Sequence, residues 1–459
     1  MSQGRLPTVR ESIITLFLVA GTIVLCLRLG SGIEGVFFPL TLAVGIIGSL
    51  SFYLRQPWKE FQEGVFAGVG KVGIAALILL LIGALVGVWI QCGTIPTLIF
   101  YGLKIISPAF FLPTTFLVCL IVSLVTGTAY GTIGTVGIAL IGVQAGFGYN
   151  ASITAGAVIS GAYFGDKMSP LSDTTNIAAA IGEADLFLHI RSMMYTTIPA
   201  AVVTFLLFWF AGNSSGVDDG DQFNNMLSGI DSGWNVGWYN LVPVIVMLSM
   251  AIKKVPTLPL IFSNVLFGLL WAVVFQDVSV SQAFGAATTG FESQTGVQSV
   301  DQVLSRGGIT SMESVITLII LAGALGGALD ATGVLKVIVE SLIGRIKRTG
   351  SLIASVLASC YTVILFTGNQ VLSLILAGQM FLPAFKKRKI DTTVLTRSLE
   401  DSGTLSAPLV PWGVAGGFCS SMLDVPVLDY LPYVWFAFTV PIFSIILGYT
   451  GIAVWKVED

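Results

Sequence analysis

The stretch Gly83-Ala-Leu-Val-Gly-Val-Trp-Ile-Gln-Cys-Gly93 recurs in related form as Gly323-Ala-Leu-Gly-Gly-Ala-Leu-Asp-Ala-Thr-Gly333, at an offset of 240 in residue number. At an offset of 241, Thr126-Gly127 lines up with Thr367-Gly368, and the segment Asp166 to Ser172 then resembles Asp401 to Ser406 once one residue is gapped. Order and spacing persist from the first of these matches to the last, which chance in a Gly/Ala/Leu-rich sequence explains poorly. The chain therefore contains two copies of one structural unit.

The chain around these copies is too apolar for a soluble enzyme. Of its 459 residues, 54% are hydrophobic and 10% are charged, and the mean hydropathy is +0.89, whereas soluble domains carry roughly 25% charged residues. No Asp, Glu, Lys, Arg or His occurs between Ile105 and Gly165 or between Ser351 and Phe385. Only lipid can solvate such long runs. A net charge of −3 with no basic face also excludes a nucleic acid partner.

The charged residues between the apolar runs predict the topology. Two acidic loops, Asn213 to Trp238 and Gln276 to Met312, are expected outside the cytoplasm. Basic clusters mark the expected cytoplasmic loops, namely Arg5 and Arg10; Arg55, Lys59 and Lys71; Lys253 and Lys254; Arg345, Lys347 and Arg348; and Lys386 to Lys389. This thread predicts a multi-pass protein of the cytoplasmic membrane with both termini cytoplasmic and an even number of spans, at most about 14.

The basic flanks also give the direction of each copy. Lys71 precedes the opening helix of the first copy, which therefore runs outward, whereas Arg345, Lys347 and Arg348 follow that of the second, which runs inward. The sequence thus predicts an all-α polytopic membrane protein with two inverted repeats and discontinuous helices. This is the architecture of secondary transporters. The expected organisation is N-terminal, scaffold-like spans in 1–71, repeat 1 in 72–212, connecting loops and two spans in 213–312, and repeat 2 in 313–455.

The densest polar stretch within the apolar regions is Gly161-Ala-Tyr-Phe-Gly-Asp-Lys-Met-Ser-Pro-Leu-Ser-Asp-Thr-Thr-Asn176. Pro170 removes a backbone donor and disfavours helix at Ser169, so carbonyl groups are freed near two carboxylates and four hydroxyls. Small hard cations prefer such oxygen ligands. The second copy offers Leu399-Glu-Asp-Ser-Gly-Thr-Leu-Ser-Ala-Pro-Leu-Val-Pro-Trp412, which is again acidic and rich in hydroxyls. Both segments are expected to be broken helices close to the middle of the membrane.

Other interpretations of these segments remain. The polar stretch of the first copy could be a solvated cytoplasmic turn, but ionised side chains inside a span cost roughly 2.5–3.5 kcal/mol each, so functional use is the default there. An intramembrane aspartyl protease also uses two carboxylates, but it needs no inverted copy of such a unit. Composition does not exclude a channel, for which no ring-forming filter motif is seen and which uncoupled current in a bilayer would reveal. Five cysteines without CxxC spacing and a single histidine indicate no cofactor.

Three motifs make the chain recognisable: Gly127-Thr-Ala-Tyr-Gly-Thr132, the segment Ser160 to Asn176, and Leu399-Glu-Asp-Ser-Gly-Thr404 followed by Pro408-Leu-Val-Pro-Trp412. These resemble the NhaC family of sodium/proton antiporters within the ion-transporter superfamily, over most of the chain from about Gly83 to Trp412. The resemblance implies re-entrant hairpins, elevator-type movement of a transport domain against a scaffold, and commonly a homodimer.

The function expected on this basis is exchange of Na⁺ for H⁺ at carboxylates that hold either ion but not both, with Asp166 and Asp173 as the exchangeable pair. The remaining expected cation ligands are Ser169, Thr174, Thr175, Asp401, Ser402 and Thr404, and the expected lining of the substrate cavity is Thr126, Thr128, Thr132, Asn176, Asn369 and Gln370. The family also includes antiporters that exchange malate and protons for sodium and lactate, and these are the alternative. Gly413-Val-Ala-Gly departs from the family pattern of Asn after Pro-Trp.

Overall fold

Helices form nearly all of the regular structure in the computed structural model, which describes residues 4–29, 33–214, 220–343 and 348–457. Within these ranges the β pairing is limited to two isolated bridges, Phe291 with Arg306 and Ile390 with Lys456. In long apolar runs the backbone must satisfy its own hydrogen bonds, and helices do so within one segment. The all-α prediction is thus confirmed. Arg345 and Lys347, used above for orientation, lie outside the described residues.

The first half of the chain contains α1 (Val9–Leu29), α2 (Phe37–Tyr53), α3 (Trp58–Gln91), α4 (Thr94–Ile105), α5 (Phe111–Thr126), α6 (Ala129–Thr132), the π-helix η3 (Ile133–Gly137), α7 (Ile138–Phe147), α8 (Ala151–Met168), α9 (Asp173–Ile181) and α10 (Leu186–Ser214). The second half contains α11 (Gly220–Gly233), α12 (Val242–Ile252), α13 (Thr257–Phe275), α14 (Val280–Thr288), α15 (Gln298–Leu304), α16 (Glu313–Thr332), α17 (Val334–Ile343), α18 (Thr349–Thr367), α19 (Gln370–Lys387), α20 (Thr392–Leu399), the π-helix η6 (Glu400–Thr404), the 3₁₀ turn η7 (Ala407–Leu409), α21 (Val414–Leu423), α22 (Val427–Tyr430) and α23 (Trp435–Thr450).

By length and composition, 8 helices of the described ranges can cross a membrane, or up to 10 if two bent pairs each count as one span. The bent pairs are Gln222–Gly233 with Trp238–Ile252, at 91°, and Val427–Tyr433 with Trp435–Thr450, at 50°. A count of 8 to 10 agrees with the polytopic expectation. The domain boundary expected at 71/72 falls inside α3, which runs unbroken for 34 residues.

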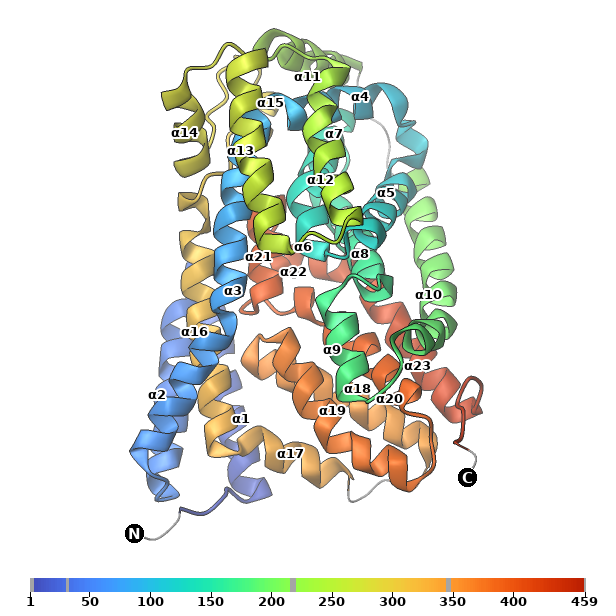
Figure 1. Ribbon diagram of the computed structural model, residues 1–459. Helices are drawn as coiled ribbons and strands as arrows, with labels where there is room; N and C mark the ends of the chain where they lie inside the picture. The colour runs from blue at the N-terminus through green and yellow to red at the C-terminus, as the bar shows by residue number, and fades with distance from the viewer. Residues whose placement is uncertain (1–3, 30–32, 215–219, 344–347, 458–459) are drawn as a thin grey trace.

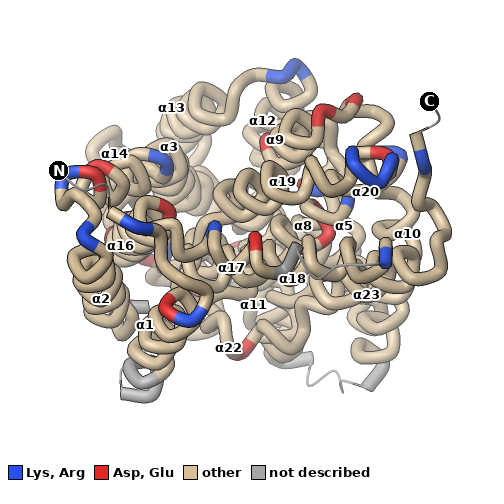
Figure 2. The backbone as a smooth tube through the Cα atoms, turned by 90° about the horizontal axis from the view of Figure 1, so that it is seen from below, with Lys and Arg blue, Asp and Glu red and all other residues tan. Residues whose placement is uncertain are grey.

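Both chain ends lie at one end of the molecule, and α11, α14 and α15, from the two acidic loops, lie at the other (Figure 1). Viewed from the end with the termini, Lys and Arg are spread over the face (Figure 2). The turn between α12 and α13, which carries Lys253 and Lys254, stops near mid-height instead of reaching that face (Figure 1). The reason is length, because the 11 residues of α12 rise only about 16 Å at 1.5 Å per residue.

Helices α3 and α16 pack against each other along small residues and run in opposite directions (Figure 1). A Cβ added at Gly68 would lie 2.2 Å from the carbonyl oxygen of Gly323, and one added at Gly327 would lie 2.2 Å from that of Gly64. Residue numbers therefore rise along α3 as they fall along α16. Glycine permits this close approach of two backbones. The two helices that carry the matching glycine-rich stretches are thus antiparallel.

Three pairs of helix starts are separated by the same offset of 241 in residue number. This offset separates Ala129 of α6 from Gln370 of α19, and it also relates the first residue of α8 to that of α20 and the first residue of α9 to that of α21. In this register Asp401 is equivalent to Ser160 of the first copy, and Asp166 is equivalent to Ala407 of the second copy. The alignment of Asp166 to Ser172 with Asp401 to Ser406 does not follow this register, because it pairs residues that are 235 or 234 apart in number.

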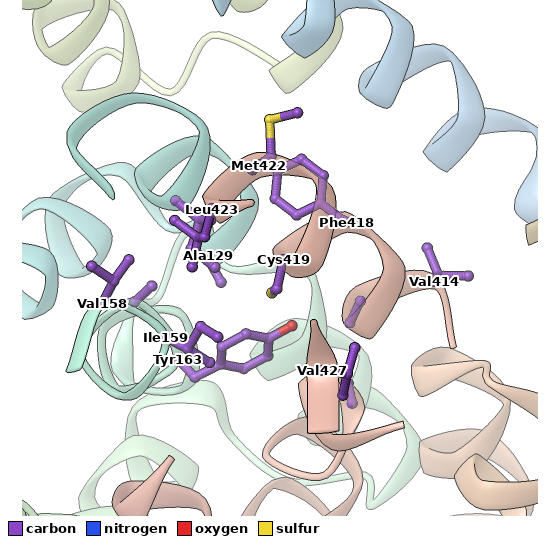
Figure 3. Close-up of a cluster of buried hydrophobic side chains, with 14 of the residues drawn as sticks. Ala129, Val158, Ile159, Tyr163, Val414, Phe418, Cys419, Met422, Leu423 and Val427 are labelled. Carbon is purple, nitrogen blue, oxygen red and sulfur yellow. The ribbon is translucent and has the colours of Figure 1, made fainter. Parts of the chain in front are cut away.

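An apolar cluster joins the two copies in the interior. Side chains of α6 and α8 face those of α21 and the start of α22, with Tyr163 and Phe418 among the largest (Figure 3). Tyr163 is 2% exposed, and its hydroxyl makes no hydrogen bond within the described residues. The interior near α8 is therefore apolar beside α21, while the charged residues of α8 lie further along the same helix, at Asp166 and Lys167.

Candidate functional site

At the first helix break, the turn that ends α5 contacts the turn that follows α8. Helix α5 ends at Gly127, whose φ is +71°, and α8 ends before the non-helical segment Ser169 to Ser172. A Cβ on Gly127 would lie 2.9 Å from the Leu171 carbonyl carbon and 3.1 Å from the Ser172 nitrogen. Glycine supplies both the left-handed conformation and the space for this contact. The segment around Ser169 and Pro170 is non-helical, as expected.

The second copy builds the same contact at the equivalent positions. Helix α18 ends at Gly368, with φ +61°, and a Cβ there would lie 2.8 Å from Gly413 Cα and 3.0 Å from the Trp412 carbonyl oxygen. The indole nitrogen of Trp412 donates a hydrogen bond of 2.6 Å to the Leu365 carbonyl. Gly403, expected in a non-helical break, lies instead within the π-helix η6. The irregular turn begins after it, at Leu405.

Asp166 is the buried carboxylate of the first break. Asp166 is 8% exposed, and its carboxylate oxygen Oδ1 accepts a hydrogen bond of 2.9 Å from the Ser172 hydroxyl. The Ser172 hydroxyl is 3.0 Å from the Thr174 hydroxyl. The Asp166 carboxylate also lies close to the backbone N–H of Ala129, at the start of α6. One carboxylate and two hydroxyls therefore converge at the N-terminal end of a helix, where the helix dipole favours negative charge.

Other residues expected as ligands hold the turn together. The Thr175 hydroxyl donates to the Lys167 carbonyl at 3.0 Å and to that of Asp166 at 3.3 Å. The Asn176 amide donates to the carbonyls of Ser172, at 2.7 Å, and Pro170, at 3.0 Å. The Ser169 hydroxyl accepts from the backbone of the turn, at Leu171, at 3.2 Å. These side chains position the site and already use hydrogen bonds to do so.

Asp173 differs from Asp166 in its surroundings. It is the first residue of α9, and its side chain is exposed. Its charge remains within electrostatic range of the Asp166 carboxylate. The two expected exchangeable carboxylates therefore occupy different positions, one inside the break and one at its solvent-accessible rim.

A second charged group links α8 to the other copy. Lys167 Nζ lies 2.9 Å from Asp401 Oδ1, and both side chains are fully buried. The Thr196 hydroxyl on α10 donates to the same Oδ1 at 2.9 Å. The neighbouring Glu400 is also fully buried, and in the described part of the chain neither of its carboxylate oxygens makes a hydrogen bond. Three helical elements thus meet around charged groups inside the protein.

The π-helix η6 carries the acidic residues of the second copy. Its five residues, Glu400 to Thr404, are all buried. The Ser402 hydroxyl donates to the Ser398 carbonyl at 2.8 Å, while that of Thr404 has no partner among the described residues. A π-helix within an α-helix often marks a functional site, because the extra residue disturbs the regular hydrogen bonding.

The residues expected to line a cavity lie at the two breaks. Thr128 caps α6 by accepting from the Gly131 nitrogen at 3.3 Å, and Asn369 caps α19 by accepting from the Leu372 nitrogen at 3.0 Å. The hydroxyls of Thr126 and Thr132 donate to carbonyls of their own helical segments. The amide nitrogen of Gln370 makes no hydrogen bond within the described residues. The two caps occupy equivalent positions of the two copies.

Sequence reasoning did not select four residues of these groups: Ser172, Lys167, Glu400 and Thr196. Ser172 belonged to the quoted motif, and a charged residue within an apolar region is itself a signal. Thr196 gave no such signal, because one hydroxyl in an apolar helix is common and its partner, Asp401, belongs to the other copy.

Five charged side chains are more than nine-tenths buried in the described ranges: Asp166, Glu400, Asp401, Lys167 and Arg397. The Arg397 guanidinium donates to the Ala453 carbonyl at 3.0 Å. Formally the set has three carboxylates and two cations, so it carries one unbalanced negative charge. Charged groups are rarely buried without a partner. No three His, Cys, Asp or Glu side chains of the described chain converge as a metal site, so a cation here would also need hydroxyl and carbonyl oxygens.

Comparison with known proteins gives a consistent result. Residues 161–452 match the model of the Na⁺/H⁺ antiporter family. The chain is 40% identical to the Na⁺/H⁺ antiporter NhaC of Alkalihalophilus pseudofirmus, over 92% of this chain and 91% of that protein. It is 36% identical to the malate-2H⁺/Na⁺-lactate antiporter of Bacillus subtilis, over 100% of this chain and 98% of that protein. A solved structure, Neisseria gonorrhoeae MtrF, is 14% identical, with a TM-score of 0.38 and coverage of 97% and 96%.

Proposed function

This chain belongs to the Na⁺/H⁺ antiporter family, and we propose that it is a secondary antiporter that exchanges Na⁺ for H⁺ across the cytoplasmic membrane. It acts as a transporter without enzymatic activity and needs no cofactor. Na⁺ and H⁺ are its substrates, and the lipid bilayer is its environment.

The observation that carries this proposal is the buried carboxylate of Asp166, which accepts a hydrogen bond from Ser172 and forms no ion pair within the described residues. One monovalent ion balances this charge, and either Na⁺ or H⁺ can do so. Sodium binds only the ionised form of a carboxylate, so the two ions compete for the same group. Competition of this kind couples their movements in opposite directions when the site changes sides only with one of the two ions bound.

We place the sodium ion at the first break. Asp166 is the inner ligand; the Ser172 hydroxyl contacts its carboxylate, and the Thr174 hydroxyl contacts that of Ser172. Asp173, at the exposed start of α9, attracts the ion at the rim and passes it inward. Asp401, Ser402 and Thr404 supply further oxygens from the second copy, and Thr128, Asn369 and Gln370 line the approach.

We propose that the protein carries out this exchange with an architecture of two inverted repeats. The common offset of the helix starts and the antiparallel packing of α3 against α16 support it. The basic residues at the end that carries both termini support a cytoplasmic location for that end. Elevator movement and a homodimer rest on the resemblance to the family.

The test is transport by purified protein in liposomes. With an imposed pH gradient, added Na⁺ should dissipate the gradient in vesicles containing wild type but not in vesicles containing Asp166→Asn. If added Na⁺ moves no protons with correctly folded wild type, the proposal is wrong.

A second candidate is exchange of malate and protons for sodium and lactate. It is favoured by the malate-2H⁺/Na⁺-lactate antiporter of Bacillus subtilis, whose similarity extends over 100% of this chain. Lys167 and Arg397 are the buried cations available to a carboxylate substrate. In the same liposomes, sodium movement that requires malate or lactate would identify this activity, whereas movement without them identifies Na⁺/H⁺ exchange.

A further inference from the structure

The ion pair between Lys167 and Asp401 has features that a structural pair would lack. The contact is close, at 2.9 Å, but poorly directed: across the described ranges, neither Lys167 Nζ nor Asp401 Oδ2 completes a hydrogen bond. Removing two charges from water costs several kcal/mol per ion, and this cost is recovered only when the remaining donors and acceptors are satisfied. The pair is therefore a weak stabiliser of the fold.

An alternative partner for the ammonium group lies next to this pair. Glu400 directly precedes Asp401 in η6, and its carboxylate interacts electrostatically with Lys167. Both of its oxygens are buried and lack hydrogen bonds within the described chain. The lysine side chain is long and flexible, and its ammonium group behaves as a point charge without a preferred plane. Because Glu400 and Asp401 are neighbours in η6, rotation of the lysine side chain offers the ammonium group a route from one carboxylate to the other.

We infer that the ammonium group of Lys167 acts as a tethered cation. It pairs with the Asp401 carboxylate when sodium is absent and moves to the Glu400 carboxylate when sodium binds Asp401. This inference rests on the proposed transport of sodium and assigns a role to two residues outside the expected ligand set. The net charge of the group then changes only by the charge of the sodium ion. The tethered ammonium also limits sodium affinity, because the ion must displace it.

In this switch, the effect of losing Glu400 on sodium affinity depends on whether Lys167 is present. Fixed charges do not produce such a dependence. With fixed charges, the loss of Glu400 weakens sodium binding by the same factor whether or not Lys167 is present. In the switch, Glu400 matters chiefly as the second position of the ammonium group. Its loss should therefore matter much less once Lys167 is removed. A double-mutant cycle measures such a dependence directly.

The experiment is sodium binding by the purified full-length protein at one fixed alkaline pH, for wild type, Lys167→Met, Glu400→Gln and the double variant. We expect Lys167→Met to tighten binding by about tenfold or more and Glu400→Gln to weaken it by a similar factor. The double variant should bind like Lys167→Met alone. An additive result, in which Glu400→Gln has its full effect in both backgrounds, would overturn the inference.

Two further variants keep the test decisive. Lys167→Arg preserves the charge, but its guanidinium can hold a carboxylate with two hydrogen bonds. The switch then predicts several-fold weaker sodium binding, whereas fixed charges predict no change, and this result does not depend on the folding of Lys167→Met. Lys386→Met removes the same charge from an exposed pair with Glu183 and should leave binding unchanged. If wild type itself binds no sodium, the proposed function fails; if it binds sodium but Lys167→Arg matches it, only the switch fails.

Discussion

The two helix breaks share a backbone arrangement and differ in chemistry. In each, a glycine with positive φ ends a long helix and packs against the turn that precedes a short helix, at Gly127 and at Gly368. The first turn leads into Ser172, Asp173 and Thr174, whereas the equivalent positions of the second are Gly413, Val414 and Ala415. The two breaks thus share their backbone geometry, while only the first carries the polar groups that we propose as ion ligands.

The acidic residues of the second copy occur at a different place. Glu400 and Asp401 lie on η6, opposite Ile159 and Ser160 of α8 in the register of the helix starts. Asp401 contacts the first copy through its ion pair with Lys167, and the break of the second copy takes no part in this contact. The comparison therefore predicts that the first break binds the ion together with oxygens from η6, and that the second break supports the structure.

The largest effect is expected for Asp166→Asn. The amide keeps the size of the side chain but removes its charge and its exchangeable proton, so Na⁺-driven dissipation of a pH gradient should fall to the level of protein-free liposomes. Ala407→Ser, at the equivalent position of the second copy, serves as the control and should transport like wild type. Equal losses in the two variants would contradict the division of roles.

The next effect is a pH dependence of sodium binding. Protons occupy the carboxylate as pH falls, so the apparent affinity of wild type for Na⁺ should weaken with decreasing pH. Well below the pKa of the group, the loss approaches about tenfold per pH unit for one competing proton. Binding isotherms across a pH series test this. An affinity that is constant over the series would exclude competition at a single carboxylate.

Alanine at the two glycines compares the breaks directly. The left-handed conformation costs a non-glycine residue about 1–2 kcal/mol, so both Gly127→Ala and Gly368→Ala should lower the melting temperature. Gly127→Ala also displaces the Leu171–Ser172 turn and should weaken sodium binding. Gly368→Ala should leave the affinity of the folded protein near that of wild type. Thermal unfolding and sodium binding, measured on the same samples, separate the two effects.

A smaller effect is expected for Asp173→Asn. Its side chain is exposed, and water screens a charge there more strongly than in the interior. Sodium affinity should fall several-fold while coupled transport persists. Complete loss of transport, equal to that of Asp166→Asn, would show that the rim carboxylate belongs to the inner site.

The smallest effect is expected for Trp412→Phe. This change removes the hydrogen bond from the indole nitrogen to the Leu365 carbonyl, worth about 1 kcal/mol of stability for a typical bond. Sodium affinity should not change, because the second break holds no proposed ligand. The melting temperature and the sodium binding constant together check the prediction.

Part of this picture could be predicted from the sequence because it depends on local or periodic features. Long runs without charge determine membrane insertion, and insertion determines helices, since the backbone has no other way to satisfy its hydrogen bonds in lipid. The matching Thr-Gly pairs at 126–127 and 367–368, visible in the sequence, coincide with the ends of α5 and α18. Pro170 likewise indicated the break after α8.

The tertiary structure alone decided which polar groups meet. Lys167 and Asp401 belong to different copies of the repeat, and Thr196 reaches Asp401 from a third helix. No local pattern encodes such contacts, because they depend on how helices pack. The same holds for exposure: Asp166 and Asp173 lie in one motif, yet the turn between them leaves one carboxylate inside the protein and the other on its surface. Burial determines how strongly a charge needs a counter-ion, so the chemistry of this motif follows from its three-dimensional surroundings.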